Sequence, residues 1–408
     1  MSAASRLVRT PGLPAGLRNR SWENSYLKAS LIVFLCASSL PAADVERLAL
    51  VREAQAAFDH AEQSPSPTLA DASACAQSQA AMLAVALPAE QALLHYRKGY
   101  CELAAAVITR GADAFADAAA ELDKGGANVL ASIARLRAGQ DADPRSLNTG
   151  VSATCPAFCD RAARLWLGWL ALRRQDLNEA AHQFAAVSES GWSAWVAGRK
   201  AFQDGQYAEA AAQYRQAADI WTHAQRDPAP TLAARVAPQP DLAQALTELG
   251  GAQLLSGHPA DAIASLNAAI QAGPPDARAF YLRARAKELA GQKDFALEDY
   301  NLASRTAFAN AKDLASGEAH LYRGIMLYRR RDFAGAEDEF SSALNLEVPA
   351  ALRPDASAWR HLSAVADGFC AASREYLERS LPAVSPYFPK AEAQALAAGC
   401  ASAARGGL

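Results

Sequence analysis

Residue types that could perform chemistry are scattered along this 408-residue chain and complete no catalytic pattern. The seven histidines form no HExxH motif or other close ligand pair, and Cys155-x3-Cys159 has no second pair of ligands to complete a zinc site. The sequence contains no Walker-type phosphate loop, no dinucleotide-binding glycine motif and no GxSxG nucleophile motif. We therefore expect no cofactor, no metal site and no catalytic residue, in a protein that is not an enzyme.

One enzymatic alternative comes from Glu189-Ser190-Gly191. This segment superficially resembles the catalytic Glu-Ser of periplasmic lytic transglycosylases, whose non-catalytic part is an alanine-rich helical superhelix. A general acid of that kind needs a substrate cleft around it. Glu189 instead falls in a short predicted turn, no Gly-Leu-Met-Gln segment follows it, and the chain offers no separate lysozyme-like domain.

Four tryptophans that lie near one another in the sequence leave two interpretations open. The helical spacing of Trp166, Trp169, Trp192 and Trp195 is typical of core packing between consecutive helices. If the rings are exposed instead, they would be stacking platforms of a superhelix that binds an extended polysaccharide or cell-wall glycan. Burial of the rings, or their position on a concave face, separates the two interpretations.

The composition indicates helices. One residue in four is alanine (100 of 408), and charged residues make up 20% of the chain. Alanine is the best helix former and is depleted in strands, so a mainly β fold is excluded.

The N-terminal residues have the three parts of a secretory signal. Residues 1–28 carry five basic side chains and one acid, residues 29–40 are apolar or small, and Pro41-Ala42-Ala43 follows. We expect export to the periplasm with cleavage near Ala42 or Ala43; a short anchor or a buried helix is the alternative. Cleavage leaves a net charge near −7, which argues against nucleic acid or anionic lipid as a partner. We expect no membrane span in the mature chain.

Six cysteines follow the predicted cleavage site and form three neighbouring pairs. In an oxidising compartment these pairs predict three local disulfides. The predicted pairs are Cys75–Cys101, Cys155–Cys159 and Cys370–Cys400.

A repeated pattern covers the middle of the chain. In each of five units a small residue precedes an alanine or equivalent small position by 12 residues, and a large residue follows four positions later. Small residues let two helices approach closely, and the large residue fills the space between them. Each unit therefore predicts an antiparallel helix pair. The small first residues are Gly168, Gly198, Gly250, Ala284 and Gly324.

The pattern resembles the tetratricopeptide repeat family over about residues 160–349, and the secretory signal suggests a bacterial exported member. The resemblance implies an all-α fold, a right-handed superhelix (α-solenoid) of antiparallel helix pairs with divergent N- and C-terminal helical caps. It also implies a non-enzymatic interaction scaffold of the cell envelope, which binds a partner protein or peptide in a concave helical groove. Gly205, Gly257 and Gly291 follow the first helices of their units, where a left-handed C-cap is expected.

The domain organisation follows from these patterns. At the C-terminus we expect one helix through Ala356–Leu377 and another through Lys390–Ala403, joined by a turn over Pro382–Pro389. The expected regions are a signal peptide with a long leader (1–43), a divergent helical region (44–147), repeats (148–224), a proline-rich linker (225–241), repeats (242–349) and a C-terminal hairpin cap (350–408).

The resemblance also assigns partner contacts, because first helices line the concave surface in this family. Two arginines on either side of a tyrosine suit an extended peptide that carries acids and apolar groups. The lysines and asparagines of the family's clamp for C-terminal carboxylates are absent, so that ligand is not expected. The alternative is that these are ordinary solvated helix residues. The assigned residues are Arg278, Tyr281, Arg285, Glu288 and Leu289, then Glu318, Leu321, Ile325, Tyr328 and Arg329 in the next unit.

Two further charge pairs keep an identical 16-residue offset in successive units. They are Arg283 with Asp299 and Arg323 with Glu339. We interpret them as exposed structural links between the two helices of one unit, each contributing about 0–1 kcal/mol.

Overall fold

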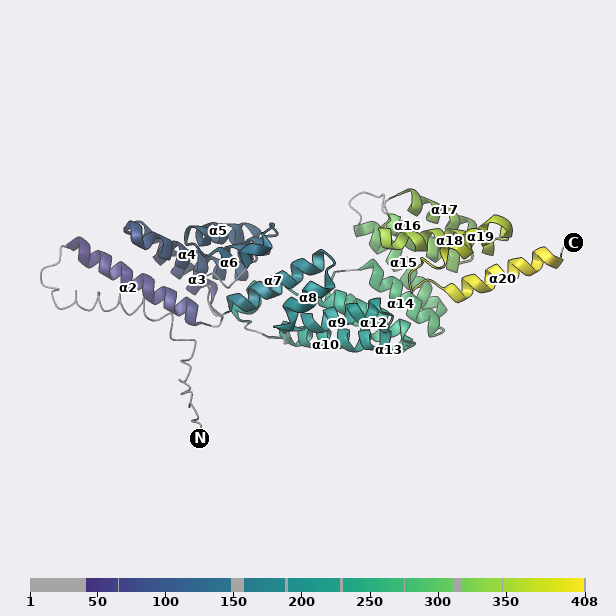
Figure 1. Cartoon of the computed structure of the whole chain (residues 1–408), viewed down its shortest axis with the longest axis horizontal. Coiled ribbons are helices and arrows are strands. Elements are labelled where there is room, and N and C mark those ends of the chain that lie inside the picture. Colours follow the sequence, from purple (N-terminus) through teal and green to yellow (C-terminus); the bar gives the residue numbers. More distant parts are fainter. Residues whose placement is uncertain are drawn as a thin grey trace, which may run out of the picture. The chain divides into compact units, whose positions relative to one another are not determined.

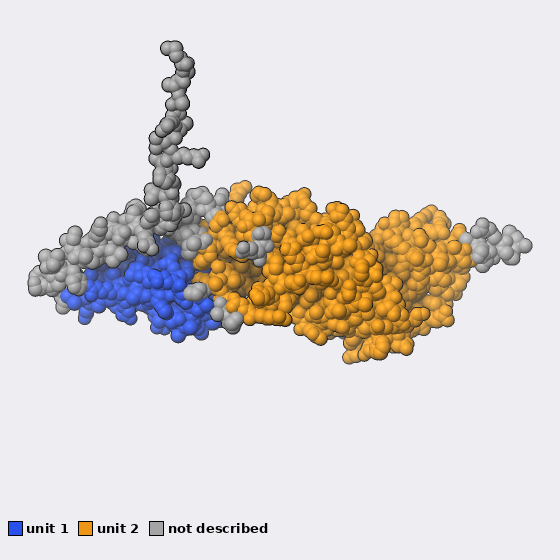
Figure 2. Space-filling view, turned by 90° about the horizontal axis from the view of Figure 1, so that it is seen from below, with its two compact units in different colours: residues 1–127 blue, residues 128–408 orange. Residues whose placement is uncertain are grey.

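A computed structural model describes residues 42–64, 66–147, 158–187, 190–227, 230–274, 276–310, 317–346 and 348–406 (Figure 1). These residues form nineteen α-helices, α2 to α20, and two short 3-10 turns, without any strand. The chain divides into two compact units, residues 1–127 and residues 128–408 (Figure 2). Residues 1–41, which carry nearly all of the predicted signal peptide, lie outside the described residues.

The first unit contains four helices, each of which contacts the next in chain order. A capping box starts the second of them, because the Thr68 hydroxyl accepts from the Asp71 backbone N–H and the Asp71 carboxylate accepts from the Thr68 N–H. Phe58 packs edge-on against Tyr100, with ring centroids 5.6 Å apart. The helices are α2 (Ala42–Gln63), α3 (Leu69–Leu83), α4 (Pro88–Thr109) and α5 (Ala112–Lys124).

The second unit is a row of antiparallel helix pairs with additional helices at both ends. Its N-terminal elements are α6 (Asn128–Arg137) and the 3-10 turn η3 (Pro144–Leu147). Five pairs follow where the repeated pattern predicts them, with the short helix α11 (Leu232–Val236) inside the proline-rich segment. The pairs are α7 (Cys159–Arg173) with α8 (Leu177–Ala185), α9 (Trp192–Gln203) with α10 (Tyr207–Gln225), α12 (Leu242–Leu255) with α13 (Pro259–Ala272), α14 (Ala277–Leu289) with α15 (Lys293–Asn310), and α16 (Gly317–Arg329) with α17 (Phe333–Asn345).

The predicted small-to-large contact is present in the four units whose small residue is glycine. A Cβ atom added to Gly168 would lie 2.5 Å from the Phe184 ring, and one added to Gly324 would lie 2.6 Å from the Phe340 ring. Gly198 faces Tyr214 and Gly250 faces Leu266 in the same way. Any side chain at these positions would push the two helices apart. The all-α fold of antiparallel helix pairs is therefore confirmed.

Glycines end the first helices of three pairs as expected. Gly205, Gly257 and Gly291 have φ angles of 74°, 84° and 79°, in the left-handed region where a Cβ atom is unfavourable. Each allows the chain to reverse into the second helix within a few residues.

One predicted helix is wrong. In place of a single helix through Ala356–Leu377, the chain forms α18 (Arg353–Ala366) and α19 (Cys370–Ser380). The cause is Gly368, whose φ of 98° ends the helix and reverses the chain. The 3-10 turn η6 (Ala350–Leu352) precedes α18, and α20 (Lys390–Gly406) ends the described chain.

Two of the three predicted cysteine pairs lie at disulfide distance. The Cα atoms of Cys75 and Cys101 are 5.8 Å apart across α3 and α4, and those of Cys370 and Cys400 are 5.5 Å apart across α19 and α20. The third pair includes Cys155, which lies outside the described residues.

Candidate binding groove

Several helices of the second unit lie beside the first helix of the next pair. α12 contacts α14, and α16 contacts α18. Between them, Tyr281 of α14 stacks on Tyr322 of α16, with ring centroids 5.3 Å apart. We call the surface made by α7, α9, α12, α14 and α16 the first-helix face. The sequence assigned its partner contacts to this face.

Three charged residues assigned to a partner instead contact one another. Arg329 Nε lies 2.7 Å from Glu288 Oε1, and Arg285 pairs with the same carboxylate. The Tyr300 hydroxyl donates to Glu288 over 2.9 Å. The three charged side chains are only 12–17% exposed. Their charges are thus compensated within the chain, in a setting where removal of one partner is costly.

Helix α20 completes this cluster from the C-terminal end of the chain. Arg329 Nη1 donates to Glu392 Oε2 over 2.8 Å, and the Tyr328 hydroxyl donates to Glu392 Oε1 over 2.9 Å. Burial raises the pKa of the Tyr328 hydroxyl, and the nearby Glu392 carboxylate raises it further. The phenol therefore stays protonated and acts as the donor.

The turn between α19 and α20 reaches the first-helix face further along. The Tyr387 ring lies 6.3 Å from the Phe202 ring, and a Cβ atom at Gly251 would collide with the Tyr387 hydroxyl oxygen. Burial raises the pKa of Tyr387 to about 12, although Arg278 beside it acts in the opposite direction. Residues 381–392, which we call the C-terminal segment, therefore cover the face from α9 to α16.

Two further contacts fix the C-terminal segment in place. Ser385 donates to the buried Asp355 carboxylate through its N–H over 2.7 Å and through its hydroxyl over 2.6 Å. Phe388 is 3% exposed and packs edge-on against Trp359, with ring centroids 5.2 Å apart. The segment is an integral part of the hydrophobic core.

These contacts correct part of the predicted partner site. Tyr281 and Tyr328 are 7% and 4% exposed and pack in the core between first helices, so they do not face a partner. Leu321 and Ile325 are buried as well. Other assigned residues remain accessible: Arg278 and Leu289 are exposed, and Glu318 is half-buried, where it accepts a hydrogen bond from Tyr322 over 2.9 Å.

Tyr387 and Glu392 were absent from the predicted site. The one sequence signal for them is the apolar content of the turn itself, because Val384, Tyr387 and Phe388 in a proline-rich turn need a surface to cover them.

The two charge pairs predicted as exposed links differ from each other. Arg323 is 51% exposed and its Nε lies 3.4 Å from Glu339, as expected for a surface pair. Asp299 is instead 2% exposed, with Arg283 Nη2 at 2.6 Å and Lys287 Nζ at 2.7 Å. Arg283 also donates to Asn267 of the preceding pair over 2.7 Å. The prediction of a weak exposed link is therefore wrong for Arg283 and Asp299, which form part of a buried network.

The four tryptophans of interest do not behave alike. Trp166 is 4% exposed, and its Nε1 donates to the Val236 carbonyl oxygen over 2.9 Å, so it is a core residue. Trp192 and Trp195 are 5% and 6% exposed, and Trp169 is half-buried. The core interpretation is confirmed for Trp166, Trp192 and Trp195. Trp169, Trp192 and Trp195 also line a pocket.

That pocket lies where α7, α9, α10 and the start of α12 meet, and none of its lining residues belongs to the C-terminal segment. Its volume is about 210 Å³. Trp221 Nε1 donates to the Ser190 carbonyl oxygen over 2.7 Å, which fixes the ring in the wall. We call this site the tryptophan pocket. It is lined by Trp169, Leu172, Arg173, Trp192, Trp195, Arg199, Trp221, Gln239, Asp241 and Gln244.

Guanidinium groups cover two of the indole rings. Arg173 lies over Trp169 and Arg199 lies over Trp195, each with Cζ 5.1 Å from the ring centroid. The one lining acid, Asp241, caps α12 by accepting from the Gln244 N–H over 2.8 Å. Beneath the face, burial raises the pKa of Glu248, which the charges of Arg199 and Arg278 partly offset.

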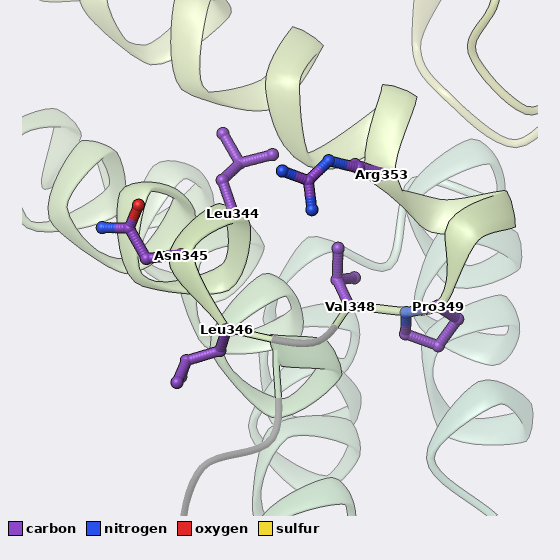
Figure 3. A pocket seen from close by; sticks show the side chains of 6 residues that line it. All are labelled: Leu344, Asn345, Leu346, Val348, Pro349 and Arg353. Atoms are coloured by element: carbon purple, nitrogen blue, oxygen red, sulfur yellow. The ribbon is translucent and has the colours of Figure 1, made fainter.

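A second hollow, of about 640 Å³, opens at the connection between α17 and α18 (Figure 3). It has no aromatic lining and little beyond Arg353 and Asn345 to orient a ligand. We therefore take the tryptophan pocket as the candidate site.

Neither metal ligands nor a spanning helix are found in the part of the chain that the structure describes. It contains no cluster of three or more His, Cys, Asp or Glu side chains that would hold a metal ion. None of its helices is both long and apolar enough to cross a membrane.

Residues 193–308 match the bacterial transcriptional activator domain family. Together with the small-to-large contact repeated between paired helices, this match indicates the type of fold. The helix pairs resemble tetratricopeptide repeats. No curated protein matches the sequence.

Solved structures similar to this chain include tetratricopeptide repeat proteins. The MamA structure is 17% identical to this chain with a TM-score of 0.30. The match covers 48% of this chain and 92% of the MamA chain. A structure of the APC/C hetero-tetramer Cut9-Hcn1 matches with 12% identity and a TM-score of 0.40. The match covers 78% of this chain and 74% of the matched chain. A tetratricopeptide repeat protein from Parabacteroides merdae has 12% identity and a TM-score of 0.33. The match covers 82% of this chain and 98% of that protein's chain. Because all three scores are low, our description of the fold depends on the helix pairs themselves.

Proposed function

We propose that this protein is a non-enzymatic scaffold of the cell envelope that binds a segment of a partner protein on its first-helix face. One observation carries the proposal: this face is already covered by a segment of the chain's own C-terminal part, a series of turns that leads into α20, through Tyr387, Phe388 and Glu392. A surface that holds one polypeptide segment by aromatic and ionic contacts suits a second segment of similar chemistry. The tryptophan pocket offers such a place beside the first.

A partner protein fits this surface better than a glycan does. A sugar ring stacks on an open indole face, but Arg173 and Arg199 cover the faces of Trp169 and Trp195. Trp192 and Trp221, which are 5% and 2% exposed, offer a narrow apolar floor and no broad open face for a sugar ring. The guanidinium groups, in contrast, are well suited to the carboxylates of a polypeptide.

Export is supported by the signal-like N-terminal sequence and by the two cysteine pairs at disulfide distance. We expect N-terminal sequencing of the periplasmic fraction to begin near Ala42 or Ala43. Peptide mapping without reductant should recover Cys75 joined to Cys101, Cys155 to Cys159 and Cys370 to Cys400. Free thiols at all six positions, or a chain confined to the cytoplasm, would contradict export.

The scaffold proposal is tested by photocrosslinking in the cells that make the protein. A benzophenone amino acid replaces Gln244, an exposed residue of the tryptophan pocket, or Gln216, an exposed residue on the second helix α10 as the matched control. We expect a discrete protein adduct from position 244, identified by mass spectrometry, and none from position 216. Equal adducts at both positions, or glycan adducts at position 244, would overturn the proposal.

A further inference from the structure

The tryptophan pocket combines two kinds of contact that one ligand can use together. Its floor is made of indole rings: Trp192 lies 5.1 Å from Trp221 and 5.7 Å from Trp195, ring centroid to ring centroid. Above this floor Arg173 and Arg199 are held against neighbouring rings. An apolar group can therefore rest on the floor while a negative charge meets the guanidinium groups.

The two arginines keep their hydrogen-bonding capacity. Among the residues that the structure describes, no carboxylate lies within ion-pair distance of Arg173 or Arg199, although the charge of Arg199 acts on the buried Glu248. Arg285 and Arg329 of the same face, in contrast, pair with Glu288. Stacking on an indole uses the flat face of a guanidinium and leaves its N–H groups directed outward. Both side chains are thus pre-positioned for an anion.

Two acids near the pocket weaken this positive charge without cancelling it. The Asp241 carboxylate caps the N-terminus of α12, where it accepts a hydrogen bond from the Gln244 N–H and its negative charge is favourable. Glu248 is 9% exposed and lies below the surface, and burial disfavours its ionised form. The accessible groups around the opening are therefore mainly cationic and aromatic.

We propose that the tryptophan pocket recognises an acidic, apolar peptide segment, in which one carboxylate binds Arg173 and Arg199 and an adjacent leucine-sized or aromatic side chain fills the space over Trp192 and Trp221. A volume of about 210 Å³ holds one large side chain and excludes a folded element. The inference rests on the proposed function and names the chemistry of its partner.

Direct binding measurements on the full chain test the proposal with defined probes. We titrate blocked hexapeptides of alternating glutamate and leucine, and follow the fluorescence of the pocket tryptophans together with calorimetry. The matched probes are the same peptide with glutamine in place of glutamate, and a soluble N-acetylglucosamine tetramer. We expect saturable binding of the glutamate–leucine peptide, at least tenfold weaker binding of the glutamine–leucine peptide, and no competition by the sugar.

Variants assign the binding to the pocket. Arg173→Gln and Arg199→Gln should each weaken the glutamate–leucine peptide about tenfold, the usual effect of losing a charge-assisted hydrogen bond. Arg330→Gln, on an exposed residue just after α16, serves as the matched control and should bind like the wild type. Circular dichroism checks that every variant is folded.

The outcomes separate this inference from the proposed function. Equal binding of the two peptides, wild-type binding by both arginine variants, or preference for the sugar would overturn the inference. If photocrosslinking at position 244 still captures one protein while the acidic peptide fails to bind, the scaffold function stands and the proposed chemistry is wrong. If crosslinking captures none, the function itself fails.

Discussion

Two stretches of the first-helix face are built from similar residues but differ in what covers them. Along α14 and α16, arginines, glutamates and tyrosines are engaged by the C-terminal segment, and Arg329 binds both Glu288 and Glu392. Along α7, α9 and the start of α12, arginines and tryptophans surround a pocket that the C-terminal segment does not reach. Arginine beside aromatic residues therefore does not by itself mark an open binding site.

The difference between the stretches lies in the acids that meet each arginine. Glu288 and Glu392 supply carboxylates to the covered stretch, whereas no described carboxylate pairs with Arg173 or Arg199 in the open one. The C-terminal segment thus covers the face from the end of α9 to α16 and leaves the tryptophan pocket for a partner.

The largest effect should come from the tryptophan that anchors the C-terminal segment. Trp359 is fully buried against Tyr328, Phe340 and Phe388, so Trp359→Ala should lower the free energy of unfolding by about 3–5 kcal/mol. The matched change in the open stretch, Trp169→Ala on a half-buried ring, should cost roughly 1–2 kcal/mol. Denaturant unfolding measures both, and equal losses would erase the distinction between the stretches.

Replacing Cys370 and Cys400, which lie at disulfide distance, should destabilise the covered stretch alone. The two cysteines are 30 residues apart, for which the chain-entropy estimate is about 3–4 kcal/mol. The double variant Cys370→Ala/Cys400→Ala should lose that much in unfolding free energy. Binding of the acidic peptide at the tryptophan pocket should not change; a lost affinity would mean that the two stretches are coupled.

The buried charge cluster around Arg329 should also contribute to stability. Arg329→Met should lower the free energy of unfolding by roughly 2–3 kcal/mol, which is less than for a fully buried pair because Glu392 is partly exposed. The substitution leaves Glu288 and Glu392 without their shared cation while keeping most of the side-chain volume. The surface control Arg330→Met should change stability very little. Thermal unfolding of both variants decides the point, and a neutral Arg329→Met would show that the cluster is not needed to hold α20.

The smallest effect concerns pH and the open stretch. Burial raises the pKa of Glu248, so folding favours its protonated form. The resulting contribution to stability is fully present below the unfolded pKa of about 4.5 and is lost as pH rises through the raised folded pKa. Glu248→Gln should therefore be more stable than wild type at pH 7, and the difference should shrink as pH falls toward 4.5. A destabilised variant at pH 7 would instead indicate a net favourable bond to Arg199 or Arg278.

The helix pairs were readily predicted because the evidence for them is local. Gly168 and Phe184, or Gly324 and Phe340, are 16 residues apart, and the small-to-large rule applies within one pair. The cysteine pairs are also between neighbouring helices in the chain.

The site was harder to predict because its covered part depends on distant residues. Tyr328 contacts Glu392 across 64 positions, and no pattern within a single repeat indicates such a partner. The same limit applies to Trp221 and Gln239, which join the pocket from outside the four tryptophans that the sequence singled out. Gly368 is the opposite case, because this single glycine inside a helical pattern is a local signal for the end of α18.

The central claim is that a partner binds beside the C-terminal segment and does not replace it. Hydroxyl-radical footprinting of the full chain, with and without the glutamate–leucine peptide, tests this by mass spectrometry of oxidised residues. We expect the peptide to slow oxidation at Trp169 in the open stretch and to leave Tyr387 in the C-terminal segment unchanged. Faster oxidation at Tyr387, with Trp169 unaffected, would show that the partner displaces the segment and would contradict the account.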